Sequence, residues 1–143
     1  MDPREIAAIP LFAGLSKDDQ KIVAQYADEV DVSAGTKLAQ EGKLAYEFFS
    51  IQDGTAEVTQ GGEPIGRLGP GDFFGEIGLL GGERRVATVT ATSPMRLVVL
   101  TGSQLRAIES RMPPLGERIR GAMAARLEAD RTRYPYHPSD IEA

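Results

Sequence analysis

The stretch GPGDFFGEIGLLGGERRVATVTA, residues 69–91, decides how the rest of the chain is interpreted. Apolar and alternating residues on both sides predict β-strands, and glycines at 75 and 78 predict a short helical turn that starts near Gly75. The first amides of such a turn lack partners within the helix, and together with the helix dipole they favour an anion. The segment therefore predicts an anion-binding loop inside a β-rich region.

Two charged side chains accompany this loop. Arg85, with Arg84 beside it, carries a guanidinium that can pair with two phosphate oxygens at once. The carboxylate of Glu76 is an acceptor for hydroxyl donors. Together they predict a small site for a phosphate attached to a sugar. A Walker loop needs Gly-Lys followed by Ser or Thr, which the sequence lacks, and a dinucleotide fingerprint needs glycine where Phe74 stands.

Residues 28–100 have the pattern of an all-β domain. Twelve of the 16 glycines lie between positions 35 and 82, and they separate short runs with alternating hydrophobicity. Gly61-Gly62 falls between two such runs and predicts a tight hairpin. Several short strands at this spacing favour a sandwich or barrel over alternating strand–helix units.

Helices are predicted on both sides of the β zone, over residues 1–27 and 101–132. Capping signals begin a helix at Ser16 and another at Thr101. Pro113-Pro114 ends the helix that Thr101 begins, because proline cannot donate to the preceding turn. Along the last helix apolar residues recur at every fourth position, as Leu115, Ile119, Met123 and Leu127.

Composition excludes several classes of protein. The 143 residues contain no cysteine and one histidine, so cysteine nucleophiles, disulfides and the histidine clusters of jelly-roll metalloenzymes are disfavoured. The net charge of −5 disfavours binding to nucleic acid by the chain itself. No apolar run approaches the ~20 residues that span a bilayer. We expect a cytoplasmic protein that is not an enzyme, holds no cofactor or metal, does not by itself bind membranes, and ends in a disordered tail over residues 133–143.

Residues 74–89 resemble the phosphate-binding cassette of the cyclic nucleotide-binding domain family, in its bacterial form. The matching runs are Phe74-Gly75-Glu76-Ile77-Gly78-Leu79 and Arg85-Val86-Ala87-Thr88-Val89. Residues 10–16, 35–42 and 51–58 are similar to the family's entry segment, early strand and hairpin. This resemblance covers about residues 6–130. It implies a mainly β fold with flanking helices, a β-roll or double-stranded β-helix jelly roll with N-terminal helices and C-terminal hinge and lid helices.

The resemblance also implies a role for each candidate site residue. Glu76 would accept the ribose 2′-hydroxyl, and Arg85 would pair with the cyclic phosphate. Main-chain amides near Gly75, Gly78 and Val86 would complete the phosphate cradle, and Ile77 is the remaining ligand-binding position. Val86 stands where members that prefer cGMP often carry threonine, so cAMP is the implied ligand and cGMP is less favoured. In the structural alternative, Glu76 and Arg85 pair with each other in a domain without ligand.

The function implied is that of a regulatory or sensor module that binds cAMP and then repositions its C-terminal helix. Pro113-Pro114, with glycines at 116 and 121, would be the hinge, and the apolar face at Ile119, Met123 and Leu127 would cover the purine. Two alternatives stay open: a ligand-free interaction domain of the same fold, and the N-terminal effector domain of a larger regulator. The expected partners are a protein effector and a second copy of the chain, bound through the C-terminal helix.

Overall fold

The computed structural model describes residues 1–44, 47–75, 85 and 87–133, with the side chains of the last helix as far as Ala125. Within them, strands form two four-stranded sheets in which neighbouring strands run antiparallel. The first sheet has the order β1 (Asp28–Val32), β8 (Met95–Thr101), β3 (Glu47–Asp53) and β6 (Phe73–Phe74). The second has the order β2 (Lys37–Ala39), β7 (Thr88–Ala91), β4 (Ala56–Gln60) and β5 (Glu63–Leu68).

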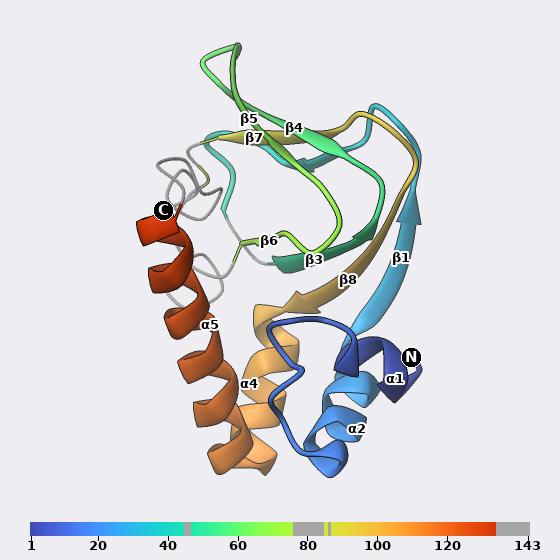
Figure 1. Ribbon diagram of the computed structural model, residues 1–143, viewed down its shortest axis with the longest axis vertical. Coiled ribbons are helices and arrows are strands. Elements are labelled where there is room, and N and C mark those ends of the chain that lie inside the picture. Colours follow the sequence, from blue (N-terminus) through green and yellow to red (C-terminus); the bar gives the residue numbers. More distant parts are fainter. Residues whose placement is uncertain (45–46, 76–84, 86, 134–143) are drawn as a thin grey trace.

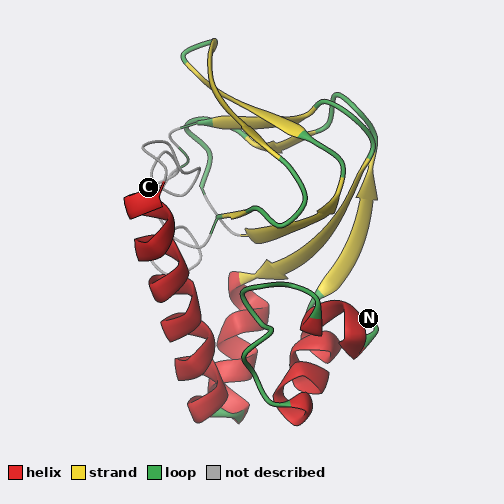
Figure 2. Ribbon diagram, viewed as in Figure 1, coloured by secondary structure: helices red, strands yellow, loops and turns green. Residues whose placement is uncertain are grey.

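The helices gather on the outer side of the first sheet, away from the second (Figure 1). They are α1 (Pro3–Ala7), α2 (Lys17–Tyr26), α4 (Gly102–Arg111) and α5 (Pro113–Arg133). Figure 2 shows the resulting separation of helices from strands, with α5 extending from the helical layer along the side of the sheets. The predicted β-roll with flanking helices is confirmed, and Gly61-Gly62 forms the turn between β4 and β5.

Strands β8, β3 and β6 of the first sheet are buried on both of their faces, whereas the edge strand β1 is exposed. Successive residues of a strand point to opposite faces, so Phe48 faces the helices and Phe49 faces the second sheet. The ring of Phe48 lies 6.3 Å from Phe12 and 5.7 Å from Phe73, whereas Phe49 stacks on Phe74 at 4.8 Å. Phe73 and Phe74 are core residues, since they are 3% and 0% exposed.

Strand β8 contributes to both cores in the same way. Val98 and Leu100 belong to the core on the helix side, and Leu97 and Val99 belong to the core between the sheets. This double burial explains why the strand is a nearly continuous apolar run, whereas a sheet with one wet face alternates apolar and polar residues.

Capping side chains set where the helices begin. The hydroxyl of Ser16 accepts from the amide of Asp19 at 3.1 Å at the start of α2. At the start of α4 the amide of Gln104 donates to the Thr101 hydroxyl at 3.1 Å, and the Thr101 amide donates to the Gln104 side chain at 2.8 Å. The second arrangement is a complete capping box, as the sequence predicted.

The first half of α5 is anchored to the other helices. Its Leu115, Ile119 and Met123 side chains are fully buried in the helix-side core. Two ion pairs reinforce this packing: Arg118 donates to Asp19 of α2 at 3.0 and 2.7 Å, and Arg120 donates to Glu109 of α4 at 2.6 and 2.9 Å. A Cβ built at Gly116 would lie 2.5 Å from the Glu109 Cγ, so this predicted hinge glycine allows α5 to approach α4 closely.

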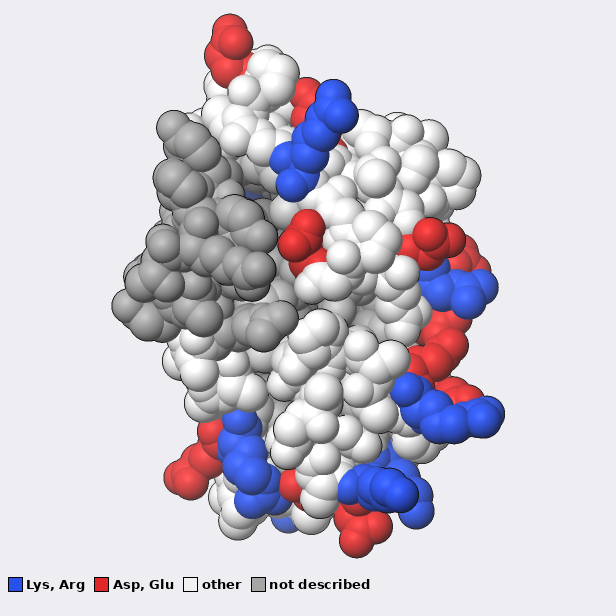
Figure 3. All heavy atoms as spheres, viewed as in Figure 1, with Lys and Arg blue, Asp and Glu red and all other residues white. Residues whose placement is uncertain are grey.

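Acidic and basic residues are mixed on the surface shown in Figure 3. Along the edge formed by α1 and β1, Arg4 pairs with Asp2 at 2.9 Å, and Arg96 lies 3.4 Å from Asp31 and 3.5 Å from Glu29. Basic residues on this face therefore lie beside acidic ones. This is unlike the continuous basic patch that nucleic-acid backbones attract.

We expect Glu109→Gln to lower the free energy of unfolding by about 0.5–1 kcal/mol near neutral pH, because the pair with Arg120 is partly exposed. Hydrogen bonds from Arg120 lower the pKa of Glu109, against burial, which raises it. A carboxyl group whose pKa is lower in the folded chain than in the unfolded chain stabilises the fold fully at pH values above its pKa in the unfolded chain. This stabilisation is lost as the pH falls through the pKa of the group in the folded chain. Urea denaturation of variant and wild type should therefore converge as pH falls from neutral into the acid range.

The matched control is Glu117→Gln, an exposed carboxylate on α5. It should change the free energy of unfolding by less than about 0.5 kcal/mol. A difference between Glu109→Gln and wild type that stays constant across pH would show that the pair acts through packing rather than charge.

Candidate functional site

Arg85 is a buried charged residue three positions before the start of β7. Its side chain is 4% exposed, and a buried charge requires hydrogen-bond partners to offset lost hydration. Its Nη2 donates to the main-chain carbonyl of Glu47, the first residue of β3, at 2.8 Å. The guanidinium is therefore held at the end of the first sheet. The other buried polar side chains of the described chain are Asp19, Gln20 and Ser50.

A glycine-led β-bulge fixes the main chain of Arg85. The Arg85 amide donates to the Lys43 carbonyl at 2.8 Å, and the Arg85 carbonyl accepts from the Gly42 amide at 2.8 Å. Two successive residues thus oppose one, and the first is a glycine with φ of 80°. β-Bulges change the direction of nearby side chains and are frequent beside functional sites. The bulge at Gly42 and Lys43 therefore explains why the Arg85 side chain is directed toward the start of β3. The main chain of Arg85 is thus held by Gly42 and Lys43, and its side chain by Glu47.

Gly75 lies against the hydrogen bond between the Arg85 guanidinium and the Glu47 carbonyl. It follows β6 with φ of 96°, a conformation that side chains disfavour. A Cβ at this position would overlap the Glu47 carbonyl oxygen and lie 3.1 Å from the Arg85 Nη1. The fold therefore brings the predicted site residues Gly75 and Arg85 together. The other predicted site residues lie outside the described part of the chain: Glu76, Ile77, Gly78 and Val86.

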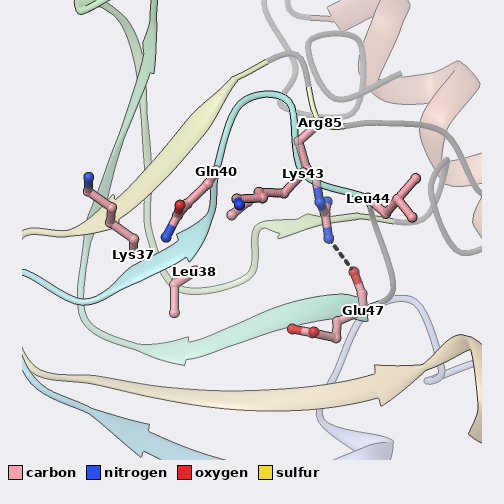
Figure 4. A pocket seen from close by; sticks show the side chains of 8 residues that line it. Lys37, Leu38, Gln40, Lys43, Leu44, Glu47 and Arg85 are labelled. Atoms are coloured by element: carbon pink, nitrogen blue, oxygen red, sulfur yellow. Dashed lines mark hydrogen bonds between the residues drawn. The ribbon is translucent and has the colours of Figure 1, made fainter.

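A cavity of about 500 Å³ opens beside Arg85 (Figure 4). It is lined by Lys37, Leu38, Ala39, Gln40, Lys43, Leu44, Glu47 and Arg85. Three of these side chains are basic and one is acidic, while the two leucines and the alanine are apolar. In Figure 4 the side chains of Gln40 and Lys43 extend along the cavity, above the carboxylate of Glu47. Such a lining suits an anion joined to a partly apolar group.

The lysines, Gln40 and Glu47 were not predicted from the sequence. They belong to β2, the connection after it and the start of β3, about forty residues before Arg85. Antiparallel pairing of β2 with β7 brings the two segments together, with Ala39 opposite Val89. In the sequence, residues 35–42 indicate only a strand and a turn. No local pattern distinguishes a cavity-lining lysine from an exposed one.

Two other kinds of site are absent from the described residues. No group of three or more histidine, cysteine, aspartate or glutamate side chains in them could hold a metal ion. None of the helices described here combines the length and the apolar character needed to cross a membrane. The cavity beside Arg85 is the candidate site because it contains the buried guanidinium, which lies against Gly75.

A β-roll with helices on one side is also the fold of several solved cyclic nucleotide-binding proteins. The cyclic nucleotide-binding domain family matches residues 29–111. The chain belongs to this family, and its resemblance in sequence to the family is confirmed.

Relatives include regulators and channels. The chain is similar to the cAMP-dependent protein kinase regulatory subunit of Mycosarcoma maydis, at 39% identity over 75% of this chain and 22% of that one. It is similar to a cyclic nucleotide-gated potassium channel of Rhizobium etli, at 31% identity over 80% and 32%. Among solved structures, the Thermus thermophilus catabolite activator protein has a TM-score of 0.69 and 25% identity, over 87% and 61%. The chain spans less than a third of the curated relatives.

We expect Gly75→Ala to lower the free energy of unfolding by about 1–3 kcal/mol. The added methyl group meets the Glu47 carbonyl and the Arg85 guanidinium, at a positive φ that alanine disfavours. Urea denaturation measures the effect. The control is Gly69→Ala, where nothing lies within 4 Å of the built Cβ and φ is not positive, so a change below about 0.5 kcal/mol is expected. Equal effects of the two substitutions would contradict the close packing at Gly75.

Proposed function

We propose that this domain is a regulatory module that binds a cyclic nucleotide, prefers cAMP, and transmits binding through α5. The observation that carries the proposal is the guanidinium of Arg85, buried at the cassette position and lining a cavity with basic and apolar walls. A cyclic phosphate is an anion attached to a ribose and a flat purine. The charge of Arg85 suits the phosphate, and the apolar part of the wall suits the base.

The proposed contacts follow the family cassette. Arg85 pairs with the cyclic phosphate, and Glu76 accepts the ribose 2′-hydroxyl. Amides near Gly75, Gly78 and Val86 complete the phosphate cradle, with Ile77 between them. The position of Gly75 beside Arg85 supports this assignment, because both belong to the same cassette and lie in contact. Preference for cAMP rests on Val86, which lacks the hydroxyl that would meet the guanine amino group.

The proposed output is a change in the position of α5. Because Ile119 and Met123 are fully buried in the helix-side core, they are not available to cover a purine while α5 holds its present position. We assign the cover to the part of α5 after Met123, which extends along the side of the sheets in Figure 1. A ligand shifts such an equilibrium only through contacts that differ between the two positions, and a covering helix provides them.

The output partner is part of the proposal. The chain spans less than a third of relatives named as a kinase regulatory subunit and as potassium channels. This favours a role as the effector domain of a larger regulator, acting on a protein partner or through a homodimer formed by α5. The competing function is a ligand-free interaction domain of the same fold. A thermal shift with cAMP separates the two, because a ligand that binds only the folded state must raise its stability.

We expect Arg85→Ala to weaken cAMP binding at least tenfold in a calorimetric titration. Loss of a charge-assisted hydrogen bond costs roughly 1.5–3 kcal/mol, and about 1.4 kcal/mol corresponds to tenfold in affinity. In the same titration the wild-type domain should bind cAMP more tightly than cGMP. A variant that binds like wild type would show that Arg85 does not contact the phosphate.

Arg85→Ala also removes the hydrogen bond to the Glu47 carbonyl, so its thermal unfolding must be measured alongside. Arg85→Lys keeps the charge but cannot donate in a fork. It should bind with intermediate affinity. Arg84→Ala, one position away, is the matched control for the loss of a basic residue and should lose much less affinity.

Amide exchange tests the proposed movement of α5. Saturating cAMP should slow exchange in residues 124–133, while residues 115–123 stay slow with and without ligand, because their apolar side chains are already buried. Strand β4 serves as the internal reference. Identical exchange in α5 with and without cAMP would rule out its role as a cover.

A further inference from the structure

Lys43 is a second basic side chain that the bulge brings to Arg85. Gly42 and Lys43 together oppose Arg85 across two main-chain hydrogen bonds of 2.8 Å. Residues opposed in this way carry side chains that start about 5 Å apart. Lys43 and Arg85 also line the same cavity, and Figure 4 shows them beginning from adjacent points of the chain. The bulge that fixes Arg85 therefore fixes the origin of the Lys43 side chain.

Within the described part of the chain, the ammonium group of Lys43 has no role in holding the fold together. The Lys43 side chain is exposed, and within the described residues it forms neither an ion pair nor a side-chain hydrogen bond. Its main-chain carbonyl already accepts from Arg85. Removing the side chain should therefore leave the Arg85 main chain in place. This separates a role in binding from a role in folding.

The two basic side chains are suited to complementary contacts with one anion. A guanidinium is planar and rigid, so Arg85, held by the Glu47 carbonyl, approaches the ligand in one direction. An ammonium on a flexible four-carbon stem adapts to an oxygen that lies outside that direction. Because the Lys43 side chain is exposed to water, its attraction is screened by salt over about 10 Å at 0.1 M.

We propose that Lys43 is a second cationic contact for the phosphate of the bound nucleotide, and that it accounts for much of the salt dependence of binding. This inference rests on the proposed function. It adds a residue that lies outside the cassette, on the connection between β2 and β3.

The test is calorimetric titration of cAMP into the full chain at about 50 mM and about 500 mM NaCl, a range over which exposed charges become screened. Lys43→Gln should weaken binding about three- to tenfold at low salt, and the loss should shrink at high salt. Lys43→Arg should retain most of the wild-type affinity, because it keeps the charge. Thermal unfolding of both variants should match wild type.

Lys37→Gln is the matched control. Lys37 lines the same cavity from β2, but in Figure 4 it lies at the far end from Arg85, beyond Gln40, whereas Lys43 begins beside Arg85 and extends toward Gln40. This variant should change affinity less than about twofold. Lys43→Gln binding like wild type at both salt concentrations would overturn the inference, as would equal losses in Lys43→Gln and Lys43→Arg. If wild type itself fails to bind cAMP, the proposed function falls as well. Loss with Arg85→Ala but not Lys43→Gln overturns only the role of Lys43.

Discussion

Burial of strands β3 and β8 on both faces is the constraint on which the rest of this structure depends. These strands occupy the middle of the first sheet, and each contributes alternate residues to the helix-side core and to the core between the sheets. Helices must therefore cover one face and a second sheet the other. Polar groups have little room inside these strands. The buried charged group therefore lies at the end of a strand, where the Glu47 carbonyl at the start of β3 accepts a hydrogen bond from Arg85.

Local features that depend on residues close together in the sequence, such as helix caps and tight turns, could be predicted. The capping box at Thr101 and the hairpin at Gly61-Gly62 depend on residues within a few positions of each other, and both are present. For these two features short-range geometry already restricts the backbone to one solution. The contact between Gly75 and Arg85 agrees with the resemblance to the family cassette, which contains both positions.

Features that depend on strand register and helix packing could not be predicted. Lys43 joins the site only because β2 pairs with β7, and Asp19 meets Arg118 across 99 positions of sequence. Gly116 was interpreted as a hinge, yet in the fold it lies against Glu109 of the neighbouring helix. A glycine that permits bending and one that permits close contact have the same sequence signature. Only the tertiary structure separates them.

Arg85 donates its hydrogen bond to a main-chain carbonyl rather than to a side chain, and this affects which substitutions the domain can tolerate. Every amino acid at position 47 presents the same carbonyl, so the anchor of the arginine is independent of the side chain found there. The Glu47 side chain itself lines the cavity. Mutation at this position can therefore remodel the wall that faces a ligand while the hydrogen bond to the guanidinium persists. Under the proposed function, anion binding and selectivity toward the rest of the ligand can therefore change separately, through single substitutions.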